Sequence, residues 1–179
     1  EHLVRERAIR VARMRELNPG YDVRVLRELP ADLADRLPAD VHPSSAADLL
    51  RLAALAAGGG WYLDLDVWPL RPLDEAVAAW GLDTDLGGRV FVSRQDHPRD
   101  PLCNAVLACE AASPAMGRLL ADAIARSPGI TLRTALGPVL LSDAWRERPE
   151  DFCLAGAAWW YPIMHHDRAW RYYRHALAG

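Results

Sequence analysis

An apolar helix that leads directly into a run of glycines and a strand is the feature that most constrains this fold. Residues 46–57 hold four leucines and six alanines, and their only charged side chains are those of Asp48 and Arg51. A helix that is apolar on all sides is normally buried. Three glycines at residues 58–60 end this helix, and residues 61–66 alternate in the manner of a strand. We therefore expect a buried helix packed against a sheet.

Helical and strand patterns alternate along the rest of the chain. Apolar spacing and the positions of Pro, Gly and Ser predict helices over residues 1–17, 31–37, 44–57, 73–80, 114–126 and 132–146, and strands over 21–26, 61–66 and 89–93. The last helix is expected to break at Gly137-Pro138, and the aromatic-rich tail from Phe152 is expected to be irregular. Because 179 residues make about one domain, the prediction is a single α/β domain.

All 21 basic residues are arginine, so the chain contains no lysine. This excludes Schiff-base and pyridoxal-phosphate chemistry and the lysine of a Walker-type phosphate loop. The net charge of −3 gives no basic footprint for nucleic acid and no polybasic membrane signal. We expect no nucleic-acid partner.

The cysteines and the hydropathy pattern bear on the compartment. Cys103, Cys109 and Cys153 form no Cys-x-x-Cys pair and are odd in number. We expect buried, reduced thiols, which are typical of a cytoplasmic protein. No run of 18 apolar residues occurs, so no transmembrane segment is expected.

The strand after the glycines carries two aspartates, Asp64 and Asp66. Strand side chains alternate between faces, so Tyr62, Asp64 and Asp66 are predicted to share one face. Two carboxylates on one face repel each other unless a cation lies between them, and hard oxygen ligands suit Mg²⁺ or Mn²⁺. The alternative interpretation is that both aspartates are solvated residues of a loop that follows a short strand.

The two charges of the apolar helix also allow two interpretations. Asp48 and Arg51 are three residues apart and so occupy neighbouring positions on one face. Asp48 stands three residues after Ser45, the spacing of a capping box, and Arg51 could simply pair with Asp48. The second interpretation is that both side chains point into a pocket and bind a polar ligand such as a sugar.

Taken together, these residues resemble a known family. Asp48-x-x-Arg51, Leu55, Gly59-Gly60 and Tyr62-x-Asp64-x-Asp66 match without a gap the signature of the DXD-containing sugar-transferase region. That region is shared by family 32 glycosyltransferases, capsular-polysaccharide enzymes and, more distantly, clostridial glucosylating toxins. The resemblance implies a GT-A-like fold, a Rossmann-like mixed sheet flanked by helices.

The resemblance also implies an activity. It implies a metal-dependent hexosyltransferase that moves a sugar from a nucleotide-sugar donor (a UDP-sugar or GDP-mannose) to a saccharide or other hydroxyl acceptor, with retention at the anomeric carbon. Asp66 would bind Mn²⁺ or Mg²⁺ at the donor's diphosphate, and Asp64 would contact the ribose and the metal sphere. Asp48 and Arg51 would hold the hydroxyls of the donor sugar.

Weaker similarities extend beyond the strand. Asn104 resembles the asparagine of the family's middle region, and Thr134-Ala135-Leu136-Gly137-Pro138 resembles its Thr-Gly-Pro element. His165-His166 with Trp170 resembles its C-terminal His…Trp element, so His165 or His166 is a candidate metal ligand. Ala47 stands where the family usually has serine, and no counterpart of the family's first strand precedes Glu1. We expect one GT-A-like domain over residues 1–179 that lacks this strand.

Two other functions compete with this hypothesis. A phosphatase of the haloacid-dehalogenase type has an Asp-x-Asp-x-Thr/Val motif, but Trp68 stands at the Thr/Val position and the usual lysine has no candidate. A degenerate transferase domain that only binds its ligand is the remaining alternative.

Overall fold

The structure is a computed structural model that describes residues 2–79, 85–95, 99 and 101–156. In chain order its elements are α1 (His2–Leu17), α2 (Ala31–Ala34), α3 (Pro43–Gly58), β1 (Gly60–Leu63), α4 (Leu73–Ala79), β2 (Val90–Arg94), β3 (Leu102–Cys109), α5 (Pro114–Arg126), α6 (Pro138–Glu147) and β4 (Phe152–Ala155). Short 3-10 turns lie at Ser127–Gly129 and Pro149–Asp151. None of the helices described is long and apolar enough to cross a membrane.

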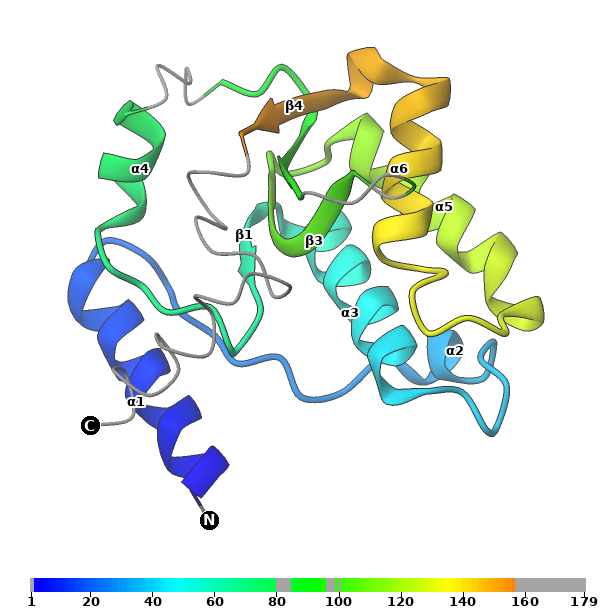
Figure 1. Cartoon of the computed structure of the whole chain (residues 1–179), viewed down its shortest axis with the longest axis horizontal. Helices are drawn as coiled ribbons and strands as arrows, with labels where there is room; N and C mark the ends of the chain where they lie inside the picture. The colour runs from blue at the N-terminus through cyan, green and yellow to red at the C-terminus, as the bar shows by residue number, and fades with distance from the viewer. Residues whose placement is uncertain (1, 80–84, 96–98, 100, 157–179) are drawn as a thin grey trace.

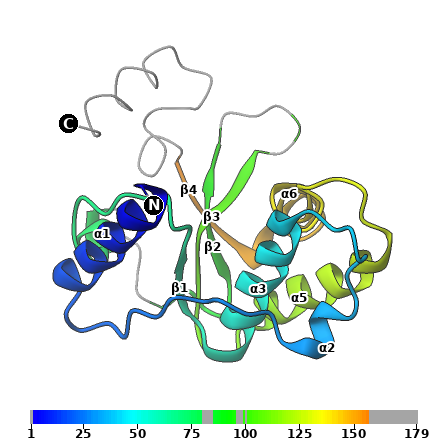
Figure 2. The same ribbon diagram turned by 90° about the horizontal axis from the view of Figure 1, so that it is seen from below.

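The strands form one mixed sheet in the order β1-β3-β2-β4. β3 lies between β1 and β2 and is antiparallel to both, whereas β4 runs parallel to β2 at the edge. Figures 1 and 2 show α3, α5 and α6 on one face of this sheet and α1 and α4 on the other side. A mixed sheet flanked by helices confirms the expected α/β, GT-A-like architecture.

The face covered by α3, α5 and α6 holds most of the apolar core. Its buried side chains come from all three helices and from the strands, among them Leu49, Leu52, Leu107, Met116 and Leu140. A smaller cluster on the opposite face is built from Phe91, Val106, Ala108 and Ala155. The central strand is therefore buried on both sides, which fixes its position within the sheet.

The apolar helix forms as predicted, with its first turn capped differently. His42 is the N-cap residue, and its Nδ1 accepts a hydrogen bond from the Ser44 backbone N–H at 3.2 Å. The capping-box interpretation of Ser45 and Asp48 is therefore wrong. Gly59 ends the helix at φ +65°, and a Cβ there would lie 2.4 Å from the backbone nitrogen of Ala111. Glycine is thus required both by the backbone conformation and by the close approach.

Other boundaries differ from the sequence prediction. Residues 21–26 are not a strand, because none of the described strands lies beside them as a ladder partner. The helices predicted over 31–37 and 132–146 are shorter, since residues 35–37 and 132–137 form turns. β1 ends at Leu63, so Asp64 and Asp66 follow the strand. The helices over 1–17, 73–80 and 114–126 and the strand over 89–93 are confirmed to within about a residue, apart from residues 1 and 80, which lie outside the described ranges.

Candidate functional site

Arg51 is the centre of a buried ionic cluster on α3. Its Nη2 lies 3.1 Å from Oδ1 of Asp48, one turn earlier on the same helix, and its Nη1 lies 3.2 Å from Oδ1 of Asp64, just beyond β1. Nη1 also donates to the Asn104 carbonyl oxygen at 2.5 Å. Asp48 and Arg51 are only 4% and 5% exposed. The predicted pair therefore exists, and it extends to the carboxylate after the strand.

Asn104 closes this cluster from β3. Its Nδ2 donates to Oδ1 of Asp48 at 2.7 Å, and the residue is 8% exposed. Leu107 faces the same core as α3 whereas Val106 faces the opposite one, so strict alternation would turn Asn104 away from α3. A register shift against β2 between Val92 and Ser93 interrupts that alternation. The irregularity aims Asn104 at Asp48, a use of bulged strands that recurs near functional sites.

Gly137 presses against the same two side chains from the N-terminus of α6. A Cβ on Gly137 would lie 2.4 Å from Nδ2 of Asn104 and 2.7 Å from Oδ2 of Asp48. A real Cβ does not approach that closely, so only glycine fits this arrangement. Gly137 belongs to the segment that resembles the family's Thr-Gly-Pro element, but the sequence alone does not place it beside Asp48 and Asn104. The Gly-Pro pair before a helix was the available signal.

Tyr62 and Asp64 connect the cluster to the edge of the sheet. The Tyr62 hydroxyl donates to Oδ1 of Asp64 at 2.8 Å, and the Arg51 guanidinium lies 4.7 Å from the centre of the Tyr62 ring. The Asp64 backbone N–H donates to the Ala105 carbonyl oxygen at 2.8 Å, which ties the residue to β3. Asp64 follows the short strand, as the loop interpretation expected, but its side chain is 29% exposed and is held by Arg51 and Tyr62.

Asp66 lies on a turn that follows β1. The Val67 N–H donates to the Asp64 carbonyl oxygen at 3.0 Å and closes this turn. Because the strand has already ended, the alternation that was predicted to align Tyr62, Asp64 and Asp66 does not reach Asp66. Asp66 is exposed, as the loop interpretation expected for it. Its charge still acts on Asp64, whose pKa it helps to raise.

Burial dominates the electrostatics of the cluster. It raises the pKa of Asp48 to about 6, against the opposing influence of the Arg51 charge and the Asn104 hydrogen bond. Burial also raises the pKa values of Asp64 and Tyr62, again against the Arg51 charge. One guanidinium thus serves two carboxylates, and Asp66 adds a third negative charge nearby. Such an excess of negative charge favours the binding of a cation.

The donor chemistry at this edge fits a hard divalent cation. Asp64 and Asp66 offer carboxylate oxygens, and no group of three or more His, Cys, Asp or Glu side chains with the layout of a metal site occurs among the residues the structure describes. Two carboxylates alone make an incomplete site for Zn²⁺. They suit Mg²⁺ or Mn²⁺, which are commonly held by one or two carboxylates together with substrate phosphates.

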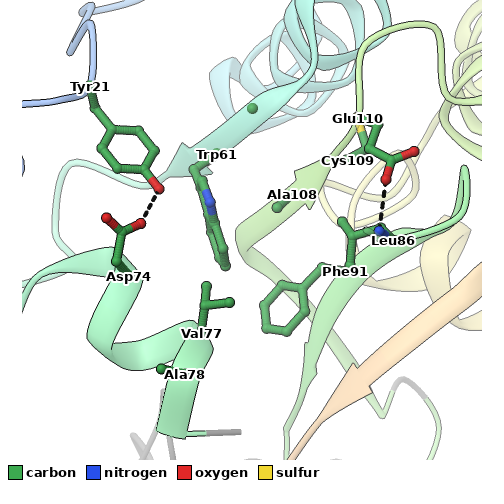
Figure 3. Close-up of a pocket in the computed structure, with 11 residues that line it drawn as sticks. Tyr21, Trp61, Asp74, Val77, Ala78, Leu86, Phe91, Ala108, Cys109 and Glu110 are labelled. Atoms are coloured by element: carbon green, nitrogen blue, oxygen red, sulfur yellow. Dashed lines mark hydrogen bonds between the residues drawn. The ribbon is translucent and has the colours of Figure 1, made fainter. Parts of the chain in front are cut away.

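A separate pocket of about 370 Å³ lies on the other side of the sheet (Figure 3). Its lining includes Trp61, Phe91, Val77 and the Tyr21–Asp74 pair, whose hydroxyl and carboxylate oxygens are 2.5 Å apart. Trp61 precedes Tyr62 on β1, and successive strand residues face opposite sides. None of the predicted site residues that the structure describes lines this pocket.

Three residues of the predicted C-terminal element lie outside the described ranges. They are His165 and His166, proposed as alternative metal ligands, and Trp170. No disulfide joins the three cysteines, all of which are described: Cys109 is buried, and Cys103 and Cys153 are half-buried. Burial raises the pKa of Cys109 to about 11, which keeps that thiol protonated and unreactive.

Part of the chain is similar in sequence to known proteins. Residues 11–84 match the model of the glycosyltransferase sugar-binding region containing DXD motif. The chain is 31% identical over 130 residues to Glucan organizing enzyme 1 of Cryptococcus neoformans var. grubii serotype A, an alignment that covers 70% of this chain and 34% of that protein. The chain thus spans about a third of the length of this curated relative. Over residues 11–84 the chain is similar to glycosyltransferase sugar-binding regions that contain a DXD motif.

Proposed function

We propose that this chain is a retaining glycosyltransferase that moves a hexosyl group from a nucleotide-sugar donor, a UDP-sugar or GDP-mannose, to a saccharide or other hydroxyl acceptor. The observation that carries the proposal is the buried Arg51, shared between Asp48 and Asp64 and followed by the exposed Asp66. A role in polysaccharide synthesis and a cytoplasmic location are part of the same proposal.

The buried end of the cluster is proposed to bind the donor sugar. A hydroxyl both donates and accepts hydrogen bonds, so a mixed set of donors and acceptors suits it. Asp48 supplies acceptors, Arg51 supplies donors, and the Asn104 amide supplies both. Because Asn104 already holds Asp48 at 2.7 Å, this set is positioned before the donor arrives.

The exposed end is proposed to hold the diphosphate. Asp64 and Asp66 would hold Mn²⁺ or Mg²⁺, with His165 as a further proposed ligand. When bound, the cation would neutralise the negative charge that develops on the departing nucleoside diphosphate. Arg51 keeps a permanent positive charge 3.2 Å from Asp64, and Tyr62 restrains the orientation of that carboxylate by its hydrogen bond.

Release of nucleoside diphosphate tests the proposal. The chain would be incubated with UDP-glucose, UDP-galactose, UDP-N-acetylglucosamine and GDP-mannose, with Mn²⁺ or with EDTA. We expect Mn²⁺-dependent release of UDP or GDP from one donor, and NMR of the product is expected to show the anomeric configuration of that donor. Release that is equal in Mn²⁺ and EDTA would contradict the metal assignment, and an inverted product would contradict retention.

A matched pair of aspartate variants makes the assignment specific. Asp66→Ala is expected to abolish the metal-dependent release of nucleoside diphosphate. Asp40→Ala removes an exposed carboxylate that is distant from Asp66 in the sequence, and it should leave this release unchanged. Mn²⁺-dependent nucleotide binding without release from any donor would favour the degenerate, binding-only domain instead.

A further inference from the structure

Arg10 on α1 contacts the turn that carries Asp66. Its Nη1 donates to the carbonyl oxygen of Leu65 at 3.1 Å, although 55 residues separate the two in sequence. Its guanidinium lies over the ring of Trp68, 5.8 Å from the centroid, and its Nη2 lies 3.4 Å from Glu6. One arginine therefore touches the residue before Asp66 and the residue two positions after it.

The turn is otherwise held near its ends. The Asp64 N–H is bound to Ala105 of β3, and the Val67 N–H is bound back to the Asp64 carbonyl. Leu65 and Asp66, between these two hydrogen bonds, are both exposed. Arg10 adds a contact from a different element at this tip of the turn. The Leu65 carbonyl belongs to the peptide unit that leads into Asp66, so fixing it restrains the direction in which Asp66 leaves the chain.

The hydrogen bonding of the Arg10 side chain indicates a role other than stabilising the fold. Its Nε is buried and has no hydrogen-bond partner within the described part of the chain. A buried donor without a partner is unfavourable, because it has lost its hydrogen bond to water and gained none in return. Keeping a guanidinium there makes sense if its other nitrogens perform a task that an apolar side chain cannot perform.

We infer that Arg10 is a positioning residue for the metal-binding turn. It fixes the Leu65 carbonyl and the Trp68 ring so that Asp64 and Asp66 are correctly spaced before a cation and a diphosphate bind. A planar guanidinium suits this task because it donates along fixed directions, stacks on an aromatic face and stays charged. The inference rests on the proposed function, since it gives the turn the task of holding a cation.

Hydrogen exchange of the chain without metal or nucleotide tests whether Arg10 restrains the turn. Arg10→Met keeps a long apolar stem over Trp68 and removes every donor, and Arg13→Met is the matched control on the same helix, where Arg13 pairs with the exposed Glu16. We expect amides of residues 64–68 to exchange severalfold faster in Arg10→Met and unchanged in Arg13→Met. Equal exchange in wild type and Arg10→Met would overturn the inference.

Nucleotide binding tests the consequence for the cation. UDP and GDP serve as probes, and the readout is the ratio of the Kd without Mn²⁺ to the Kd with Mn²⁺. Mutating residues that orient the ligands of a metal typically changes the metal affinity by about 10–100-fold. We therefore expect Arg10→Met to reduce this ratio of Kd values roughly tenfold. The Kd that Arg10→Met shows without Mn²⁺ should stay within about twofold of the wild-type value, because a residue that only positions the metal ligands does not affect nucleotide binding in the absence of metal. Arg10→Lys retains one donor and the charge, and should recover part of the ratio.

The outcomes separate the inference from the proposed function. If wild type shows no Mn²⁺ effect for either nucleotide, the proposed function fails, and hydrogen exchange still decides whether Arg10 holds the turn. If wild type shows the effect and Arg10→Met keeps it in full, the inference fails while the function stands. An equal loss in Arg13→Met would also overturn the inference, since it would assign the effect to α1 in general. If Arg10→Met does not fold, hydrogen exchange and the ratio of Kd values are measured on Arg10→Lys instead. Values equal to those of wild type would then count against the inference.

Discussion

The two ends of the candidate site are built in different ways. At one end Asp48, Arg51 and Asn104 come from α3 and β3, are less than 10% exposed, and hold one another through ion pairs and hydrogen bonds. At the other end Asp66 stands exposed on a turn beyond β1. The first end is part of the folded core, and the second is attached to its edge.

This difference determines what a mutation at each end reports. A buried charge that loses its partner is strongly destabilising, so substitutions among Asp48, Arg51 and Asn104 should change stability and activity together. An exposed carboxylate is solvated in the folded and unfolded chain alike, so its removal should change activity alone.

Replacing Arg51 should have the largest effect. Arg51→Met removes the guanidinium between Asp48 and Asp64 and leaves two carboxylates facing each other in a largely buried place. The expected loss is about 3–5 kcal/mol in the free energy of unfolding, measured by urea denaturation at pH 7. Arg36→Met, which removes an exposed arginine near α2, is the control and should lie within about 0.5 kcal/mol of wild type. A loss below about 1 kcal/mol for Arg51→Met would mean that the buried end is not held by its charges.

Adding one methyl group at Gly137 should have the next largest effect. In Gly137→Ala the new Cβ would fall 2.4 Å from Nδ2 of Asn104 and 2.7 Å from Oδ2 of Asp48, so both side chains must move. Overpacking of this kind is unfavourable by about 1–3 kcal/mol, and the displacement should also weaken donor binding. Gly117→Ala is the matched control, because nothing lies within 4 Å of a Cβ at that position on α5. If both variants were equally stable and active, the contact at Gly137 would not constrain the site.

Part of the buried cluster at the candidate site could be predicted from the sequence. Asp48 and Arg51 stood out because charges are rare in an otherwise apolar helix, and the contact between them follows from helical spacing. Asp64 was placed near a ligand but not beside Arg51, since no local pattern says which helix packs against the end of a strand. Gly137 and Arg10 were missed as site contacts for the same reason: their contacts join residues 33 or more positions apart in the chain.

The strands show where local patterns fail. β3 was not predicted, although it is an internal strand that pairs with both β1 and β2. The interruption that turns Asn104 toward α3 disturbs its alternation. β4 was hidden at the start of an aromatic-rich tail and is only four residues long. Conversely, residues 21–26 alternate as a strand should and form none, because a strand requires a partner that this segment lacks in the sheet.

A third prediction uses pH to isolate Asp48. Its pKa is raised from 3.8 to about 6 in the folded chain, so between these values the folded state binds a proton more tightly than the unfolded state. The stability that this proton supplies is present below about pH 4 and is lost as the pH rises through 6. Between pH 4.5 and 7, wild type should therefore lose on the order of 1 kcal/mol more than Asp48→Asn does, as measured by urea unfolding. Asp64 shifts in the same direction but is present in both proteins, so the difference isolates Asp48. Parallel profiles would place Asp48 in a more solvated environment than its burial indicates.

Asp66→Ala should have the smallest effect on stability and a decisive one on ligand response. Because Asp66 is exposed, its removal should change the free energy of unfolding by less than about 0.5 kcal/mol. A ligand that binds only the native state raises the unfolding temperature, so wild type should gain Tm when Mn²⁺ and the cognate nucleotide are added together. Asp66→Ala should lose that gain and keep the Tm of the ligand-free chain. A large drop in the Tm of ligand-free Asp66→Ala would contradict the difference between the two ends of the site. It would show that the exposed turn also stabilises the fold. A retained gain with Mn²⁺ would instead move the cation away from Asp66 and leave Asp64, already bound to Arg51 and Tyr62, as the carboxylate that must hold it.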